Sequence, residues 1–137
     1  MNFKEYLALF LFLFLVIACQ KDDLTIMEER IAGDWGWISS SGGLLGLVLN
    51  PQTEGYQMQI LFQKNGIYTK YRDSSAVDER NYWIEKSADE SLYNLKIGSR
   101  DHLQINEQYK ISFDNQNNLH LIEVCNDCME HIYYLKE

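Results

Sequence analysis

The sequence predicts an all-β fold, namely an eight-stranded antiparallel up-and-down barrel with a short N-terminal helix. Three observations favour this fold class. From residue 34 onwards, aromatic and β-branched residues alternate with polar ones, which is the period of a half-buried strand. Turn-forming residues recur roughly every 8 to 12 positions, as in all-β domains. Short strands joined by short turns favour closure, because a barrel has no exposed sheet edges.

The chain begins with an apolar stretch outside this domain. The stretch Leu7–Ala18 follows Lys4 and is shorter than the roughly 20 residues that a membrane-spanning helix needs, so it has the layout of a secretory signal peptide. It leads into Val16-Ile17-Ala18-Cys19, which resembles the lipobox of bacterial lipoproteins. The resemblance implies that residues 1–18 are a cleaved signal peptide. It also implies that Cys19 carries fatty acyl chains such as palmitate.

The residues after the lipobox are expected to form a lipidated tether, residues 19–24, that leads to a domain at residues 25–137. Gln20-Lys21-Asp22-Asp23 resembles the surface-export signal of some Gram-negative lipoproteins. That resemblance implies an outer-membrane lipoprotein exposed at the cell surface, with a plain tether facing the periplasm as the alternative. Two or more acyl chains anchor a protein stably, so the membrane is the expected partner through Cys19.

The charge of the chain excludes some partners. The formal net charge is −8, and an acidic domain repels nucleic acid and acidic lipid headgroups. We therefore expect neither nucleic-acid binding nor electrostatic docking on a membrane. No phosphate-binding loop or Ser–His–acid pattern is recognisable, so we expect no enzymatic activity and no cofactor. The oligomeric state is left open.

A short helix is expected before the first strand. Thr25-Ile26-Met27-Glu28 has the form of a capping box, which predicts a helix over about Ile26–Ala32 that ends at Gly33. The first strand is expected over Asp34–Ser40, and the remaining strands follow in meander order. The inward-facing residues of the middle strands are expected to be Tyr82, Ile84, Tyr93, Leu95, Ile97, Tyr109, Ile111 and Phe113.

Two hairpins set the expected register. Asn65-Gly66, within Gln57–Arg72, predicts a two-residue type I′ turn, because both central residues of such a turn need positive φ. That turn would place Phe62 opposite Thr69, and Ile60 opposite Tyr71, on the core face. In the last hairpin, Leu119 and Leu121 are expected opposite Tyr134 and Ile132.

A longer pattern points to a family. Gly33-Asp34-Trp35 follows the helix, as the Gly-x-Trp motif of lipocalins does, and further motifs accompany it. The sequence resembles the small lipocalin-like lipoproteins of Gram-negative bacteria over residues 25–137. The resemblance implies an eight-stranded barrel with Gly33 and Trp35 at its closed base, and no common ligand. Arg30 or Lys136 would take the place of the arginine that packs on the tryptophan in lipocalins. The further motifs are Trp35-Gly36-Trp37-Ile38, Ser41-Gly42-Gly43, Asn50-Pro51, Leu61-Phe62, Asn65-Gly66 and Tyr68.

The barrel interior is the candidate ligand site. An eight-stranded barrel is just wide enough for side chains or for one small ligand, and buried tyrosine hydroxyls need partners. A polar-lined pocket for a small apolar or amphipathic ligand is one reading. The alternative is a filled barrel that serves as a surface interaction or structural module. Leu44–Leu49 is expected to cover the barrel mouth as a lid, although, if exposed, it would mark an interaction site. The candidate ligand-binding residues are Tyr71, Tyr82, Tyr93, Tyr109 and Tyr134.

The two remaining cysteines are expected in the last hairpin turn. A β-turn brings its first and fourth Cα atoms within about 7 Å, so a structural disulfide between Cys125 and Cys128 is feasible. A two-residue turn would place His131 on the other face of the sheet, so we expect no metal site. The same register would place Glu123 opposite Glu130, where both carboxylates are expected to be solvated at the hairpin tip.

Overall fold

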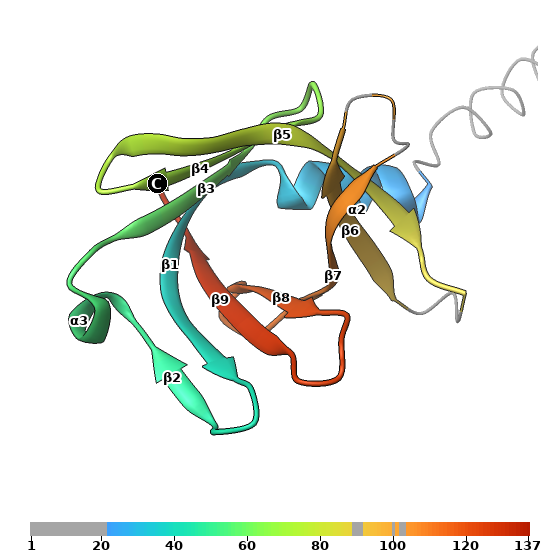
Figure 1. Cartoon of the computed structure of the whole chain (residues 1–137). Helices are drawn as coiled ribbons and strands as arrows, with labels where there is room; N and C mark the ends of the chain where they lie inside the picture. The colour runs from blue at the N-terminus through green and yellow to red at the C-terminus, as the bar shows by residue number, and fades with distance from the viewer. Residues whose placement is uncertain (1–21, 89–91, 100, 102–103) are drawn as a thin grey trace, which may run out of the picture.

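The computed structural model describes residues 22–88, 92–99, 101 and 104–137, and Cys19 and residues 1–18 lie outside this part of the chain. Within it, an antiparallel sheet closes into an eight-stranded barrel because β1 pairs with both β3 and β9, and β2 adds one strand beside β1 (Figure 1). The predicted all-β barrel is confirmed. The strands are β1 (Gly33–Gly42), β2 (Leu47–Leu49), β3 (Met58–Phe62), β4 (Ile67–Arg72), β5 (Ser75–Lys86), β6 (Tyr93–Gly98), β7 (Ile105–Phe113), β8 (Leu119–Glu123) and β9 (Met129–Leu135).

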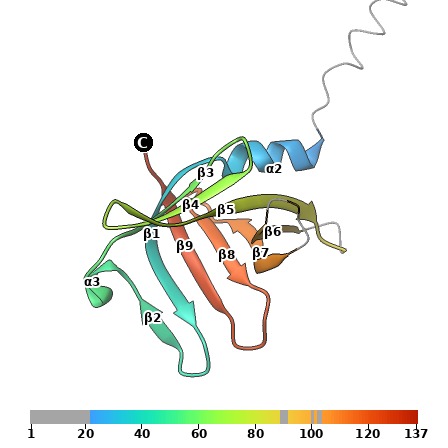
Figure 2. The same cartoon turned by 45° about the horizontal axis from the view of Figure 1, so that its top comes forward.

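Helix α2 (Asp23–Ile31) lies against one end of the barrel (Figure 2). It begins earlier than the Thr25 cap predicted. The Asp22 side chain accepts a hydrogen bond from the Thr25 amide at 2.7 Å, and this bond lowers the pKa of Asp22. Asp23 and Leu24, which we assigned to the tether, therefore belong to the helix. The other helix in the described part of the chain, α3 (Pro51–Glu54), is a single capped turn, and neither of these two helices is long and apolar enough to span a bilayer.

The closed base of the barrel is built around Trp35, which is only 2% exposed. Its indole N–H donates to the Ile31 carbonyl at 2.8 Å and thereby ties α2 to β1. Its ring centroid lies 6.1 Å from that of Phe113. The Arg30 guanidinium lies over Phe113, 3.7 Å from the ring centroid, and Lys136 donates to Gln59. The predicted cation–π contact to Trp35 is therefore replaced by a contact of Arg30 with Phe113, whose ring is tilted by 48° against that of Trp35.

The register of the β3–β4 hairpin differs from the prediction by one residue. Phe62 pairs with Tyr68 and Ile60 with Lys70. The loop has three residues, closed by a bond from Gln63 N–H to the Ile67 carbonyl, and only its last residue, Gly66, has positive φ. This is a type I turn with a glycine bulge rather than a type I′ turn. Since strand side chains alternate, the shift turns Tyr68 inward in place of Tyr71.

The β8–β9 hairpin departs from its predicted register in the same way. Leu119 pairs with Tyr133 and Leu121 with His131, so Tyr134 and Ile132 do not face the two leucines. The connection runs from residue 124 to residue 128, and the Val124 amide still bonds to the Gln108 carbonyl of β7. An odd-length loop shifts the pairing by one position and moves His131 to the inner face.

The segment Leu44–Leu49 is not a lid. It forms the turn and second strand of a hairpin with β1, in which Ser40 pairs with Leu49 and Gly42 with Leu47. This β1–β2 hairpin (Gly42–Leu49) projects beyond the barrel (Figures 1 and 2). The side chains of Leu44 and Leu45 are each 85% exposed at its tip. The expectation that it covers the mouth was wrong, because the ladder to β1 continues outward instead of folding inward.

Candidate functional site

The tyrosines divide between the two faces of the barrel wall. Tyr82, Tyr93 and Tyr109 belong to or pack against the core, as predicted. Tyr71 alternates with the inward-facing Lys70, and Tyr134 is exposed, so these two predictions were wrong. The reason in each case is the one-residue hairpin shift, which places the buried Tyr68 and Tyr133 inside instead.

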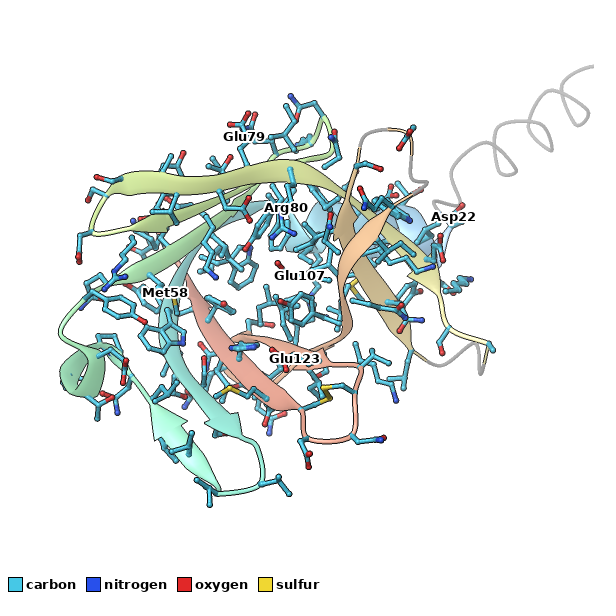
Figure 3. All side chains as sticks on the ribbon, in the orientation of Figure 1. Asp22, Met58, Glu79, Arg80, Glu107 and Glu123 are labelled. Carbon is cyan, nitrogen blue, oxygen red and sulfur yellow. A yellow bond between two sulfur atoms is a disulfide. The ribbon has the colours of Figure 1, made fainter. Side chains whose placement is uncertain are left out.

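A cluster of charges crosses the barrel interior. Arg80 on β5 contacts Asp78 on the same strand and Glu107 on β7, and the Tyr109 hydroxyl donates to Glu107 at 2.5 Å. Figure 3 shows Arg80 and Glu107 inside the ring of strands, whereas Glu79 points away from it. Successive side chains of a strand point to opposite faces, and here the interacting charged residues lie on the inner face.

The positive and negative charges of this cluster compensate one another. Burial would raise the pKa of Glu107, but the hydrogen bonds from Tyr109 and Arg80 lower it, so the carboxylate is ionised. Burial, reinforced by the Glu107 carboxylate, raises the pKa of Tyr109 well above its usual range, so its hydroxyl stays a donor. Lys70, the strand partner of Asp78, adds a second cation. The cations Arg80 and Lys70 balance the anions Asp78 and Glu107. The cluster therefore has no net charge that would attract an ionic ligand.

The free space inside the barrel is small. A cavity of about 50 Å³ lies among the inward-facing side chains. It can hold ordered water, whereas ligand pockets usually enclose roughly 300–1,000 Å³. The interior is therefore largely filled. The cavity is lined by Met58, Ile60, Tyr68, Lys70, Ile97, Tyr109, Leu121, His131 and Tyr133.

A chain of hydrogen bonds joins three strands near this cavity. The Trp37 indole donates to Ser40 Oγ at 2.9 Å, Ser40 Oγ lies 2.6 Å from His131 Nδ1, and His131 Nε2 lies 3.0 Å from Glu123 Oε1. The indole can only donate, so Ser40 Oγ accepts from Trp37, and His131 Nε2 donates to the Glu123 carboxylate, which can only accept. A bulge between Trp37 and Ser39 turns Ser40 inward.

The order Ser40–His131–Glu123 resembles that of a nucleophile, a base and an orienting acid. However, Ser40 is 2% exposed and does not line the interior cavity. A substrate carbonyl therefore has no route to its hydroxyl. These hydrogen bonds have a structural effect instead, because they link polar side chains of β1, β8 and β9 to one another.

Glu123 and Glu130 do not form a pair of carboxylates. Glu130 pairs with Ile122, and its side chain contacts His120 Nδ1 at 2.6 Å, whereas Glu123 contacts His131. The predicted opposition of the two carboxylates was wrong, again because of the hairpin register.

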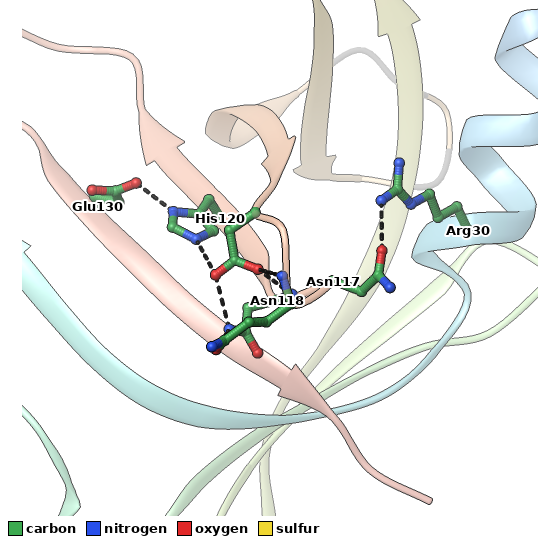
Figure 4. A network of polar contacts seen from close by, with 7 residues as sticks. Arg30, Asn117, Asn118, His120 and Glu130 are labelled. Carbon is green, nitrogen blue, oxygen red and sulfur yellow. Dashed lines mark hydrogen bonds and ion pairs between the residues drawn. The ribbon is translucent and has the colours of Figure 1, made fainter.

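His120 lies between two carboxylates (Figure 4). Its Nε2 lies 3.3 Å from Asp114, whose carboxylate also accepts from the amide of Asn118 and holds the β7–β8 turn. Burial would lower the pKa of His120, but Glu130 and Asp114 raise it. The hydrogen bonds from Asn118 contribute most to lowering the pKa of Asp114 to about 2.

We expect His120 to make stability depend on pH. The folded-state pKa is raised, so its contribution is fully present below the unfolded value of about 6.5 and is lost as pH rises through the folded-state value. At pH 6, His120→Gln should cost about 1 kcal/mol, because the groups are partly exposed to solvent, and at pH 9 much less. Urea unfolding at both pH values measures this, and an equal cost at both would contradict it.

The last hairpin also carries a disulfide. Cys125 and Cys128 are bonded, with their Cα atoms 5.3 Å apart. Glu123 lies beside them, since its Oε2 atom is 3.8 Å from Cys125 Sγ. The sequence indicated the cysteine pair, but not the approach of Glu123 and His131, because that approach depends on the loop length.

Two features of the outer surface bear on function. One is the apolar β1–β2 hairpin, where Leu47 and Val48 are exposed in addition to Leu44 and Leu45. The other is a hollow of about 330 Å³ where α2 approaches β5 and the β3–β4 turn. The hollow is lined by Thr25, Glu28, Glu29, Lys64, Gly66, Tyr82, Trp83 and Ile84.

Comparisons with known proteins add no relative to this description. The chain matches no protein-family model, and no curated protein or solved structure is significantly similar to it. The functional interpretation therefore depends on the chain's own residues and geometry.

Proposed function

We propose that this protein is a lipid-anchored outer-membrane lipoprotein whose barrel is a non-enzymatic interaction module. The β1–β2 hairpin docks into an apolar cleft of a partner protein. The observation that carries this proposal is the exposure of Leu44 and Leu45 at the tip of a hairpin built on a filled barrel. Exposed apolar patches of this kind mark interaction sites.

The lipobox resemblance of Val16-Ile17-Ala18-Cys19 supports the anchor. Helix α2 begins at Asp23, four residues after Cys19, and four extended residues reach about 14 Å. β1 begins next to α2, and the hairpin tip lies beyond the opposite end of this strand (Figure 2). The 10 residues of β1, which lie between α2 and the tip, span about 33 Å. A short tether therefore favours a partner other than the anchoring membrane.

The composition of the hairpin indicates the chemistry of that partner. No charged residue occurs from residue 38 to residue 53, although the chain carries a net charge of −8. Acidic residues border this stretch, with Glu54 after it and Asp127 at the tip of the neighbouring β8–β9 hairpin. An apolar cleft with a neutral or basic rim complements such a surface. β2 pairs only with β1 in the described part of the chain, so its outer edge can add backbone hydrogen bonds.

Binding of a small apolar or amphipathic ligand is the second candidate. The interior cavity of about 50 Å³ is too small for such a ligand, but the hollow beside α2, about 330 Å³, falls within the usual range. Tyr82, Trp83 and Ile84 give it an apolar wall. Native mass spectrometry of the protein isolated from its own host tests this candidate, and a small molecule that co-purifies would favour it.

Photo-crosslinking in cells of its own host tests the main proposal. Benzoylphenylalanine in place of Leu47 should give one protein adduct in the washed membrane fraction. The double substitution Leu44→Asp, Leu45→Asp should reduce the adduct about 10-fold or more, because each buried leucine contributes about 1.5–3 kcal/mol. Val77→Asp, a matched change of another exposed apolar residue on β5, should leave it unchanged.

Three outcomes would overturn this reading. They are an adduct that the two aspartates do not weaken, an adduct with lipid, and an adduct with a second copy of the chain. The same cells test the anchor, because Cys19→Ala should release both protein and adduct from the washed membranes. Retention of that variant on the membrane would refute lipidation as the anchor.

A further inference from the structure

The last hairpin brings together groups that can ligate zinc-class metal ions. The sulfur atoms of Cys125 and Cys128 and a carboxylate oxygen of Glu123 lie within 4.8 Å of one another. The sequence argument against a metal placed His131 on the opposite face, whereas the structure places it 3.0 Å from Glu123. We propose that, once its disulfide is reduced, this hairpin binds one zinc-class divalent cation through Cys125, Cys128 and Glu123.

The positions of the two cysteines suit a tetrahedral ion. Zinc binds cysteine thiolates at about 2.3 Å, so two thiolates on one ion lie about 3.8 Å apart. The Cα atoms of Cys125 and Cys128 are 5.3 Å apart, so the sulfurs can reach that separation by side-chain rotation alone. Glu123 supplies an oxygen ligand and water completes four-coordination, which is the pattern of zinc sites with three protein ligands.

The third ligand is already oriented. The Met129 amide donates to Glu123 Oε2 at 3.2 Å, and His131 Nε2 donates to Oε1. His131 is in turn held by Ser40, which accepts from Trp37. Partners that hold a ligand in this way usually contribute 10- to 100-fold to metal affinity. His131 is thus a positioning residue for this site.

The redox state of the cysteines controls the site. A dithiol reductant transfers two electrons and two protons to the protein disulfide, so the S–S bond breaks, two thiols form and the reductant becomes a disulfide. The metal then displaces the two thiol protons, because the thiolate is the ligand. Cys125 is exposed and can meet the reductant. The oxidised hairpin is therefore closed to metal and the reduced hairpin is open.

Cobalt binding to the full chain tests this inference. The chain carries Cys19→Ala, which leaves only Cys125 and Cys128 as thiols, and is purified in mild detergent. After reduction with a dithiol and desalting without oxygen, it should bind one Co²⁺ per chain, with sulfur-to-cobalt charge-transfer absorption that Zn²⁺ abolishes. The oxidised chain should show at least 100-fold weaker binding. Circular dichroism and thiol titration verify the fold and the reduction.

Matched variants separate the roles of the residues. Cys125→Ser or Cys128→Ser should abolish the charge-transfer signal, and Glu123→Gln should weaken binding about 10-fold. Asp127→Asn removes a carboxylate from the same loop that lies outside the cluster, and it should have no effect. His131→Leu should weaken binding 10- to 100-fold. His131→Gln should preserve more of it, because the amide can still donate to Glu123.

Two results would overturn the inference. The first is no cobalt binding by a reduced chain that retains its β fold and two free thiols. The second is binding that the oxidised chain or the Cys125→Ser variant retains in full. An effect of Asp127→Asn equal to that of Glu123→Gln would also refute the assigned oxygen ligand, because it would show that any acidic group of the loop serves.

Discussion

Replacement of Trp35 by alanine should destabilise the domain by about 3–5 kcal/mol, the range for removal of a fully buried aromatic side chain. Trp35 is 2% exposed, its indole N–H ties the Ile31 carbonyl to β1, and its ring packs near Phe113. The substitution leaves a cavity at the base and an unpaired buried carbonyl. The free energy of urea unfolding of the full chain carrying Cys19→Ala, in mild detergent, measures the effect.

Trp35→Phe is the matched control. It keeps an aromatic ring at the base but removes the indole N–H, so it should cost about 1–2 kcal/mol for the lost hydrogen bond and the smaller ring. A cost below about 1 kcal/mol for Trp35→Ala would mean that α2 does not close the barrel through this residue.

Arg80→Met should have the second largest effect, a loss of about 2–3 kcal/mol. It leaves Asp78 and Glu107 facing each other inside the barrel with one cation, Lys70, beside them. Breaking a fully buried ion pair costs about 3–5 kcal/mol, and the expected loss is smaller because Arg80 and Glu107 are 22% and 35% exposed. Equilibrium unfolding of each variant measures the loss.

A double substitution separates charge imbalance from lost packing. Arg80→Met combined with Glu107→Gln restores equal numbers of cations and anions, so it should be more stable than Arg80→Met alone. Arg72→Met, which removes an exposed arginine that lies over Tyr56, should cost less than about 1 kcal/mol. A double variant less stable than either single variant would show that packing, and not charge, dominates the cluster.

These two residues illustrate how far sequence reasoning reaches. Trp35 was expected at the base because Gly33-Asp34-Trp35, which follows a helix and opens a strand, resembles the Gly-x-Trp motif of lipocalins, and such a motif is a local feature of the sequence. The Arg80 cluster was not predicted, because Glu107 comes from a strand 27 residues further along the chain. Alternation places both residues on inner positions, but their contact crosses the intervening strand β6, which a prediction of neighbouring strand pairs does not include.

The candidate site likewise combines features that the sequence predicted with features that it did not predict. Cys125 and Cys128 stand out in the sequence, and Leu44 to Leu49 stand out as an apolar run in a connecting segment. The neighbours of the cysteines and of the barrel tyrosines were predicted wrongly, because the β3–β4 and β8–β9 loops contain odd numbers of residues where two-residue turns were expected. A one-residue shift moved Tyr68, Tyr133 and His131 inward and Tyr71 and Tyr134 outward.

The sequence by itself determined the class of fold and the identity of most core strands, because the period of two between apolar and polar residues is a local property. It also supplied the lipobox resemblance that predicts where the protein is held. Only the tertiary structure decided the register, the exposure of the β1–β2 hairpin and the meeting of Glu123 with His131 and the cysteines. These depend on loop geometry and on barrel closure, which involve residues far apart in the chain.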